Sequence, residues 1–266
     1  MLLYIELKYR YGSYECAKTV SFRPHRHLPE AGIHGNNTMV KSLILSPEGV
    51  VSLRIDIGCG SSKESGYLGI DRIAYPGVDI VCDINEEIPL PDNTAEFVMA
   101  SRVLPYVNNL MAVMAEIYRI STHKGVVCIL APYAHSYPHS SNPFFKQKFD
   151  EYTPRYLTGH FFQPSSSVLS PVIPDYPVPL PPFDYRLLRM ELFYQFPFDQ
   201  SLYEAEELDV LKTLQANVVH EIMYHFAVIK QEISQFELEA MSRNQYPEPS
   251  VLLQRRRFAK LRQDFI

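Results

Sequence analysis

Residues 53–83 read LRIDIGCGSSKESGYLGIDRIAYPGVDIVCD, and this stretch decides the fold. It contains three short apolar runs, at 53–57, 67–70 and 78–81, each closed by a glycine or an acidic residue. Runs of this kind are typical of parallel strands whose carboxyl ends line one crevice, and open α/β sheets bind their ligands in that crevice. The pattern therefore predicts a ligand site at the ends of three neighbouring strands.

The residues at these three strand ends indicate a nucleoside. Gly58 and Gly60 carry no side chain, so a ligand can lie against the backbone. Asp71 can accept hydrogen bonds from both hydroxyls of a ribose, because a carboxylate suits two donors. Asp83 can accept a hydrogen bond from an exocyclic amine. Together the four residues predict a pocket for an adenosine.

The same stretch argues against a dinucleotide. A pyrophosphate needs a third small residue in G-x-G-x-x-G and a helix N-terminus. Here the third position is Lys63, and the segment from Gly60 to Asp71 leaves room only for a very short helix. S-adenosylmethionine (SAM) is an adenosine without phosphate and needs neither feature. An NAD(P)-dependent oxidoreductase is the less favoured alternative.

The motifs of this region resemble, in their order, those of the class I SAM-dependent methyltransferases of the type 11-like group. Within this group the motifs most resemble a subfamily in which the connection between the first two strands, the first crossover, is short. It is carried by D-x-G-C-G, a lysine, G-Y-x-G-x-D and P-G-V-D-I-V-x-D, which here occupy residues 56–60, 63, 66–71 and 76–83. It continues through residues 88–93, 116–119 and 124–125, and returns weakly at 217–230.

The resemblance implies an α/β fold with a Rossmann-like, seven-stranded class I methyltransferase sheet and helices on both faces. It also implies that SAM is the cofactor. The residues expected to bind SAM are Asp56, Gly58, Cys59, Gly60, Asp71, Arg72, Asp83, Ile84 and Ser101.

The sequence departs from its relatives beyond the cofactor motifs. Relatives carry a His and a Glu-His pair where this chain has Arg102, Pro105 and Tyr106. Their Asp-Pro-Thr-His element is replaced by residues 142–145, which read NPFF. These departures leave two functions open. One is a methyltransferase acting on a small-molecule or peptide-like acceptor, at oxygen or nitrogen. The other is a degenerate SAM-binding protein that serves as a partner-binding or structural protein without turnover.

Apolar periodicity predicts the remaining elements. Helices are expected at 110–118, capped by Asn108 or Asn109, and at 204–214. His220 and His225 fall on opposite faces of the last strand and are interpreted as structural. Four strands are expected, at 97–100, 126–130, 185–196 and 218–229, with the last two antiparallel.

Residues 131–185 form a proline-rich insertion, with 11 of the chain's 21 prolines between Pro132 and Pro182. Such a stretch continues neither a sheet nor a long helix, so it predicts an ordered loop or lid at the carboxyl end of the fifth strand. Its second part, 165–182, is expected to be looser.

The start of this insertion offers candidates for catalysis. His135 is the favoured general base and His139 the second, because an imidazole titrates near neutral pH and both follow a strand end. The alternative is that both are ordinary loop histidines. Tyr106 and Tyr133 are expected to shape the acceptor pocket.

Composition indicates which broad classes of protein and partner fit this chain. The 266 residues are 46% hydrophobic with a formal charge of −5, which fits a globular core and gives no global signal for nucleic acid. No metal site is expected: the four cysteines lack metal-like spacing, and His25, His27 and His34 read as a polar connector. The cysteines are interpreted as reduced, in a cytoplasmic protein. No apolar run approaches a membrane span. A homodimer is left open.

Three regions follow. Residues 1–50 are an N-terminal appendage with a β-hairpin turning at 12–13. Residues 51–230 are the methyltransferase domain, which contains the insertion 131–185. Residues 231–266 are a helical, basic tail, whose charged residues are interpreted as a solvated helix face.

Overall fold

The computed structural model describes residues 8–11, 14–17, 53–174, 179–199, 202–253 and 255–256. The chain divides into two compact units, residues 1–34 and 35–266. In the smaller unit, β1 (Lys8–Tyr11) pairs antiparallel with β2 (Tyr14–Ala17), which confirms the hairpin. The turn at 12–13 and the three histidines considered for a metal lie outside the described residues.

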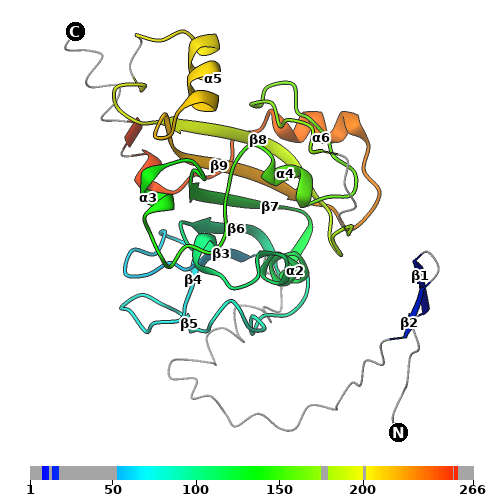
Figure 1. Cartoon of the computed structure of the whole chain (residues 1–266). Helices are drawn as coiled ribbons and strands as arrows, with labels where there is room; N and C mark the ends of the chain where they lie inside the picture. Colours follow the sequence, from blue (N-terminus) through cyan, green and yellow to red (C-terminus); the bar gives the residue numbers. More distant parts are fainter. Residues whose placement is uncertain are drawn as a thin grey trace, which may run out of the picture. The chain divides into compact units, whose positions relative to one another are not determined.

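The larger unit is built on one seven-stranded sheet in the order β5-β4-β3-β6-β7-β9-β8 (Figure 1). The strands β5 to β7 are parallel, whereas β9 runs antiparallel to both of its neighbours. This mixed α/β sheet confirms the predicted fold class. The strands are β3 (Leu53–Ile57), β4 (Leu68–Asp71), β5 (Ile80–Val81), β6 (Ala95–Ser101), β7 (Ser121–Pro132), β8 (Tyr185–Tyr194) and β9 (Val219–Val228).

Short helices surround the sheet. They are η1 (Leu104–Tyr106), α2 (Leu110–Ile120), α3 (Tyr137–Ser140), α4 (Thr153–Tyr156), α5 (Ala205–Leu214) and α6 (Gln235–Ser242). The Asn109 side chain caps α2 by accepting a hydrogen bond from the Ala112 N–H, and Glu204 and Glu207 form a capping box on α5. Both predicted helices are therefore confirmed. No helix in the described part is long and apolar enough to cross a membrane.

Two cores cover the two faces of the sheet. On one face, Met114 and Ile117 of α2 and Phe149 of the insertion pack against the buried strands. On the other face, Leu238 of α6 and Leu252 are fully buried against β6, β7 and β9. Residues near the C-terminus thus supply a layer of this fold.

The basic residues of this C-terminal layer are ion-paired where the structure describes them. Arg255 donates a hydrogen bond of 2.8 Å to the Tyr194 carbonyl, and Arg256 bonds Glu191 and Glu248. Arg255 and Arg256 are thus only partly solvated, because each also bonds a residue of β8, which the interpretation as a solvated helix face did not include. The later basic residues of the tail lie outside the described part.

The predicted short first crossover is confirmed. Residues 58–67 join β3 to β4, and residues 72–79 join β4 to β5, without a helix in either connection. A parallel connection usually passes through a helix. Its absence shortens the path between the strand ends and leaves the glycine turn to be shaped by side chains.

Candidate functional site

The turn after β3 is held tightly by its neighbours. Gly58 has φ +67°, and its N–H donates to the Ile70 carbonyl at 2.7 Å. A Cβ on Gly58 would lie 2.3 Å from Val103 Cγ2, so only glycine fits between this turn and the end of β6. The turn therefore lies directly beside the carboxyl ends of two strands, as predicted.

Asp71 fastens the end of β4 to this turn. Its Oδ2 accepts a 2.9 Å hydrogen bond from the Gly60 N–H, and its Oδ1 accepts one from the Ile73 N–H. Gly60 also has a positive φ, +54°, but a Cβ there would meet nothing within 4 Å. The backbone at Gly60 is thus open to a ligand, and each Asp71 oxygen retains a second lone pair for one.

Asp56, at the end of β3, is 3% exposed and accepts a 2.9 Å hydrogen bond from the Glu64 N–H. Burial raises the pKa of its carboxyl from 3.8 to about 6. Burial likewise raises the pKa of the neighbouring Cys59 to about 11, so this thiol stays protonated at neutral pH. Both groups sit under the turn as largely uncharged polar groups in mildly acidic solution.

Because the fold favours protonated Asp56, its ionisation weakens the folded state as the pH rises from about 4 to about 6. The Asp56→Asn variant keeps an acceptor for Glu64 and cannot ionise. Its stability relative to the wild type should improve by about 3 kcal/mol across this window. Urea unfolding of both proteins at several pH values measures the difference, and parallel pH profiles would contradict the prediction.

Lys63 plays a part that the sequence did not reveal. Its ammonium pairs with Asp79 at 2.7 Å, and the same Asp79 oxygen accepts the Gly69 N–H at 2.7 Å. A Cβ on Gly69 would lie 2.5 Å from Lys63 Cδ. The lysine side chain therefore lies across β4 and joins the two helix-free crossovers. The sequence marked Lys63 only as part of the family motif and as the residue that breaks a dinucleotide motif.

The other expected cofactor residues lie at or just after the ends of β4, β5 and β6. Asp83 is exposed, and its Oδ1 accepts hydrogen bonds from both the backbone and the side chain of Asn85. Ile84 is buried, at 7% exposed, and Arg72 is exposed. Ser101 is half-buried at the end of β6. The parallel register of β3, β4, β5 and β6 brings all of these positions to one edge of the sheet.

Arg102, one of the departures from the relatives, is held by an ion pair. It has φ +60°, and its guanidinium forms a two-pronged pair with Glu221 of β9 at 2.5 and 2.9 Å. Glu221 is 2% exposed. A backbone in this region costs a non-glycine residue roughly 1–2 kcal/mol, which the two charge-assisted bonds can offset. This side chain therefore ties the end of β6 to β9.

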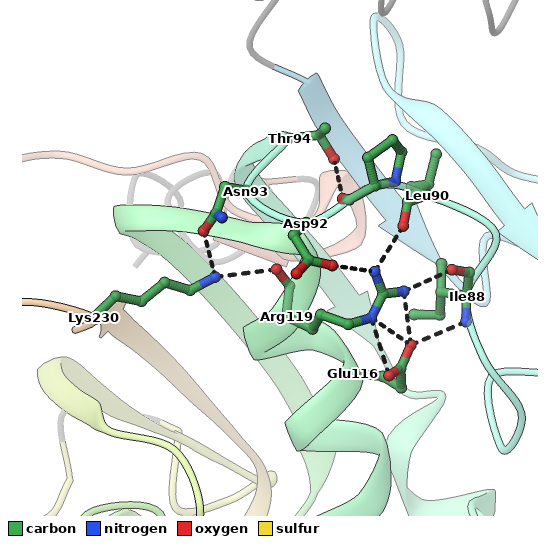
Figure 2. Close-up of polar contacts among 9 residues, drawn as sticks. Ile88, Leu90, Asp92, Asn93, Thr94, Glu116, Arg119 and Lys230 are labelled. Carbon is green, nitrogen blue, oxygen red and sulfur yellow. Dashed lines mark hydrogen bonds and ion pairs between the residues drawn. The ribbon is translucent and has the colours of Figure 1, made fainter. Parts of the chain in front are cut away.

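A polar brace fixes the segment that follows Asp83 and Ile84 (Figure 2). From α2, the Arg119 guanidinium donates to the carbonyls of Ile88 and Leu90, each at 2.8 Å. It also pairs with Glu116 and Asp92 at 2.9 and 2.8 Å. The Lys230 ammonium adds bonds to the Asn93 side chain and the Arg119 carbonyl. One helix residue thus positions the connection from β5 to β6.

Arg119→Ala should destabilise the fold by roughly 2 kcal/mol, because it leaves two carbonyls without their donor and Glu116 without its charged partner. Arg119→Lys should lose about half as much, since an ammonium cannot span the same partners. Urea unfolding measures both variants. A wild-type midpoint for Arg119→Ala would contradict the role of the brace.

The two candidate histidines differ in environment. His139 is buried at 6% exposure and packs against Phe145, and Tyr106 packs on the same ring. Burial lowers the pKa of His139, and its Nδ1 has no hydrogen-bond partner among the described residues. His135 is exposed, and its ring meets the edge of Tyr133. The structure therefore groups His139 with Tyr106 and, separately, His135 with Tyr133.

A cavity of about 690 Å³ opens beside the second pair, between the insertion and α5. Tyr133, His135 and Glu151 line one side, and Lys212 lines another. The insertion around it is ordered: Ser170, in the part expected to be looser, is buried and donates to the Glu151 carbonyl at 2.7 Å.

Comparison with known proteins finds one family match, and it covers the middle strands of the sheet. A family model described as a methyltransferase domain matches residues 69–129, from β4 into β7. The resemblance to class I SAM-dependent methyltransferases is thereby confirmed, and the matched range includes Asp71, Asp83 and Ser101. No curated protein sequence matches the chain.

Solved structures with a similar fold include a chain in the complex between the Haloferax volcanii Trm112 methyltransferase activator and the putative methyltransferase. It is 11% identical, with 74% of this chain and 90% of that chain covered and a TM-score of 0.42. A SAM-dependent methyltransferase from Archaeoglobus fulgidus is 16% identical, with 66% and 86% covered and a TM-score of 0.42.

Proposed function

We propose that this protein transfers a methyl group from SAM to a small-molecule or peptide-like acceptor, at oxygen or nitrogen. The observation that carries the proposal is the bond between Gly60 and Asp71, which joins an open glycine turn to a carboxylate at the edge of a methyltransferase sheet. No helix starts at this turn to receive a pyrophosphate. The geometry favours a nucleoside without phosphate.

In this proposal the strand ends hold the cofactor. The free lone pairs of Asp71 accept the ribose hydroxyls, and Asp83 accepts the exocyclic amine of the adenine. The backbone at Gly58, Cys59 and Gly60 lies against the amino acid part. The remaining contacts are assigned to Asp56, Arg72, Ile84 and Ser101.

SAM supplies the reactive methyl carbon and the leaving group. The protein must place the acceptor in line, exclude water and remove a proton. The insertion that follows β7 is the element that can do so, since it starts at the same edge of the sheet as the cofactor residues. We assign proton removal to His135 and a wall of the acceptor site to Tyr133, because both line the cavity, whereas Tyr106 is not among its lining residues.

The His135→Ala variant should retain SAM binding but release S-adenosylhomocysteine roughly 100-fold more slowly with acceptors present. His139→Ala is the matched comparison, because it removes a buried histidine of the same segment. Turnover of SAM with a panel of small amines and alcohols measures both. Unchanged turnover in His135→Ala would overturn its assignment as the base.

A SAM-binding protein without turnover is the second candidate. It is favoured by Arg102, whose guanidinium is engaged with Glu221 at the place where the relatives carry other polar residues. SAM binding without release of S-adenosylhomocysteine for any acceptor in the panel would select it. Cys59, Cys82 and Cys128 are free thiols, which supports the proposal of a reducing, cytoplasmic location.

A further inference from the structure

The cavity between the insertion and α5 contains an ionic cluster, buried at Glu151, largely buried at Lys212 and exposed at Asp209, that the cofactor does not use. Glu151 is 5% exposed, and its two oxygens accept hydrogen bonds from the Tyr133 hydroxyl at 2.8 Å and the Lys212 ammonium at 3.0 Å. Lys212 also pairs with Asp209 at 2.9 Å. Burying such charges is costly unless they are paired, so a cluster of this kind at a cavity wall needs an explanation.

The protonation states within the cluster are fixed by its geometry. Burial, reinforced by the charge of Glu151, raises the pKa of Tyr133 far above its ordinary value. Burial alone would lower the pKa of Lys212, but its hydrogen bonds to Asp209 and Glu151 outweigh that effect and raise it. Tyr133 therefore remains a hydroxyl and Lys212 an ammonium, and neither can take a proton from a bound acceptor.

The cluster presents an excess of negative charge and of acceptor atoms. Two carboxylates, Glu151 and Asp209, face the single ammonium of Lys212. The Tyr133 oxygen donates its only proton to Glu151 and keeps its lone pairs. A ligand that brings N–H donors and a positive charge satisfies these groups, whereas a carboxylate or phosphate would be repelled.

The other walls are apolar. Val168, Leu169 and Pro171 come from the insertion, and Leu214 comes from the end of α5. Leu169 and Leu214 are 68% and 75% exposed, so they offer apolar surface that the described residues leave uncovered. A volume of about 690 Å³ lies within the range of small-molecule sites. The ligand should therefore combine an amine with an apolar body.

The cavity also lies close to the place of methyl transfer. Tyr133 follows β7 directly, and Leu130 of β7 pairs with Ser101 at the end of β6. We infer that this cavity binds the methyl acceptor and that the acceptor is an amine with an apolar body, recognised by Glu151. This inference deepens the proposed function and rests on it.

The step then balances as an N-methylation. The bound ammonium first gives a proton to His135, which lines the same cavity, or to water. The lone pair that this frees on nitrogen then forms the bond to the methyl carbon, while the carbon–sulfur bond breaks and its electron pair stays on sulfur, so that the product is a methylated ammonium. Glu151 holds the amine by hydrogen bonds and is not itself the base.

The test uses three probes of one shape and different charge, phenethylamine, phenethyl alcohol and phenylacetate, titrated into the whole protein with S-adenosylhomocysteine present. Calorimetry should detect the amine and neither of the others. Glu151→Gln should weaken amine binding roughly ten-fold, because a charged hydrogen bond becomes a neutral one. Binding of phenylacetate in preference to the amine, or no binding of any probe, would overturn the inference.

A second variant covers the case in which Glu151→Gln fails to fold. Leu169→Trp fills the cavity from its exposed rim and should abolish amine binding, whereas Val172→Trp, outside the lining and 78% exposed, should not. Equal amine binding by the two tryptophan variants would contradict the site. Titration with SAM alone separates the two proposals: SAM binding without amine binding sinks only this inference, and amine binding without SAM binding sinks the proposed function.

Discussion

The Asp71→Ala variant is expected to lose SAM binding by a factor of about 100 or more. The variant removes the carboxylate proposed to accept two ribose hydroxyls, and charge-assisted hydrogen bonds contribute about 1.5–3 kcal/mol each. It also leaves the Gly60 and Ile73 N–H groups without an acceptor, because in the wild type each donates a 2.9 Å hydrogen bond to Asp71. The turn that lies against the cofactor therefore loosens at the same time.

Isothermal calorimetry with SAM measures this loss, with thermal unfolding as a check that the variant is folded. Glu232→Ala is the matched control, because it removes an exposed carboxylate far along the chain and should bind SAM as the wild type does. Near wild-type affinity in folded Asp71→Ala would show that the end of β4 does not hold the ribose.

The second large effect is expected from Gly58→Ala, which should destabilise the fold by roughly 3–4 kcal/mol. The new methyl group would lie 2.3 Å from Val103 Cγ2 and 2.5 Å from Val103 Cβ, and a β-branched side chain has little freedom to move away. Overpacking adds about 1–3 kcal/mol to the roughly 1–2 kcal/mol cost of alanine at positive φ.

Gly60→Ala is the sharp comparison for this variant. It places the same methyl group on a positive φ two residues later, where nothing lies within 4 Å. We expect a stability cost of only about 1 kcal/mol there, but a strong loss of SAM binding, because the open backbone is the surface assigned to the ligand. Urea unfolding measures the stability of each variant, and calorimetry measures its affinity for SAM. Equal stability losses would show that Val103 does not constrain the turn.

The strands of the proposed SAM site and the helix α2 could be predicted from sequence, because the residues that determine them are close together in the chain. Apolar runs closed by glycine or aspartate gave the strands and the positions of Gly58, Gly60 and Asp71. The spacing of apolar residues, with Asn109 before them, gave α2 and its cap. These signals need only a few consecutive residues, and the parallel topology then brings the strand ends together.

The parts that could not be predicted depend on residues far apart in the chain. Arg102 pairs with Glu221, and Glu151 pairs with Lys212. The partners are so far apart in sequence that the spacing of residues cannot predict either pair. Arg256 looked like surface charge because its partner Glu191 lies on β8, about a quarter of the chain away. Polar pairs of this kind become visible only when the sheet places their strands side by side.

The central claim is that the carboxyl ends of β3, β4 and β5 form the SAM site, and amide NMR tests it most directly. On addition of S-adenosylhomocysteine to the 15N-labelled protein, the resonances of Gly58, Gly60, Asp71 and Asp83 should shift together and saturate at one equivalent. Shifts confined to other parts of the sheet, or none at saturating ligand, would contradict the account.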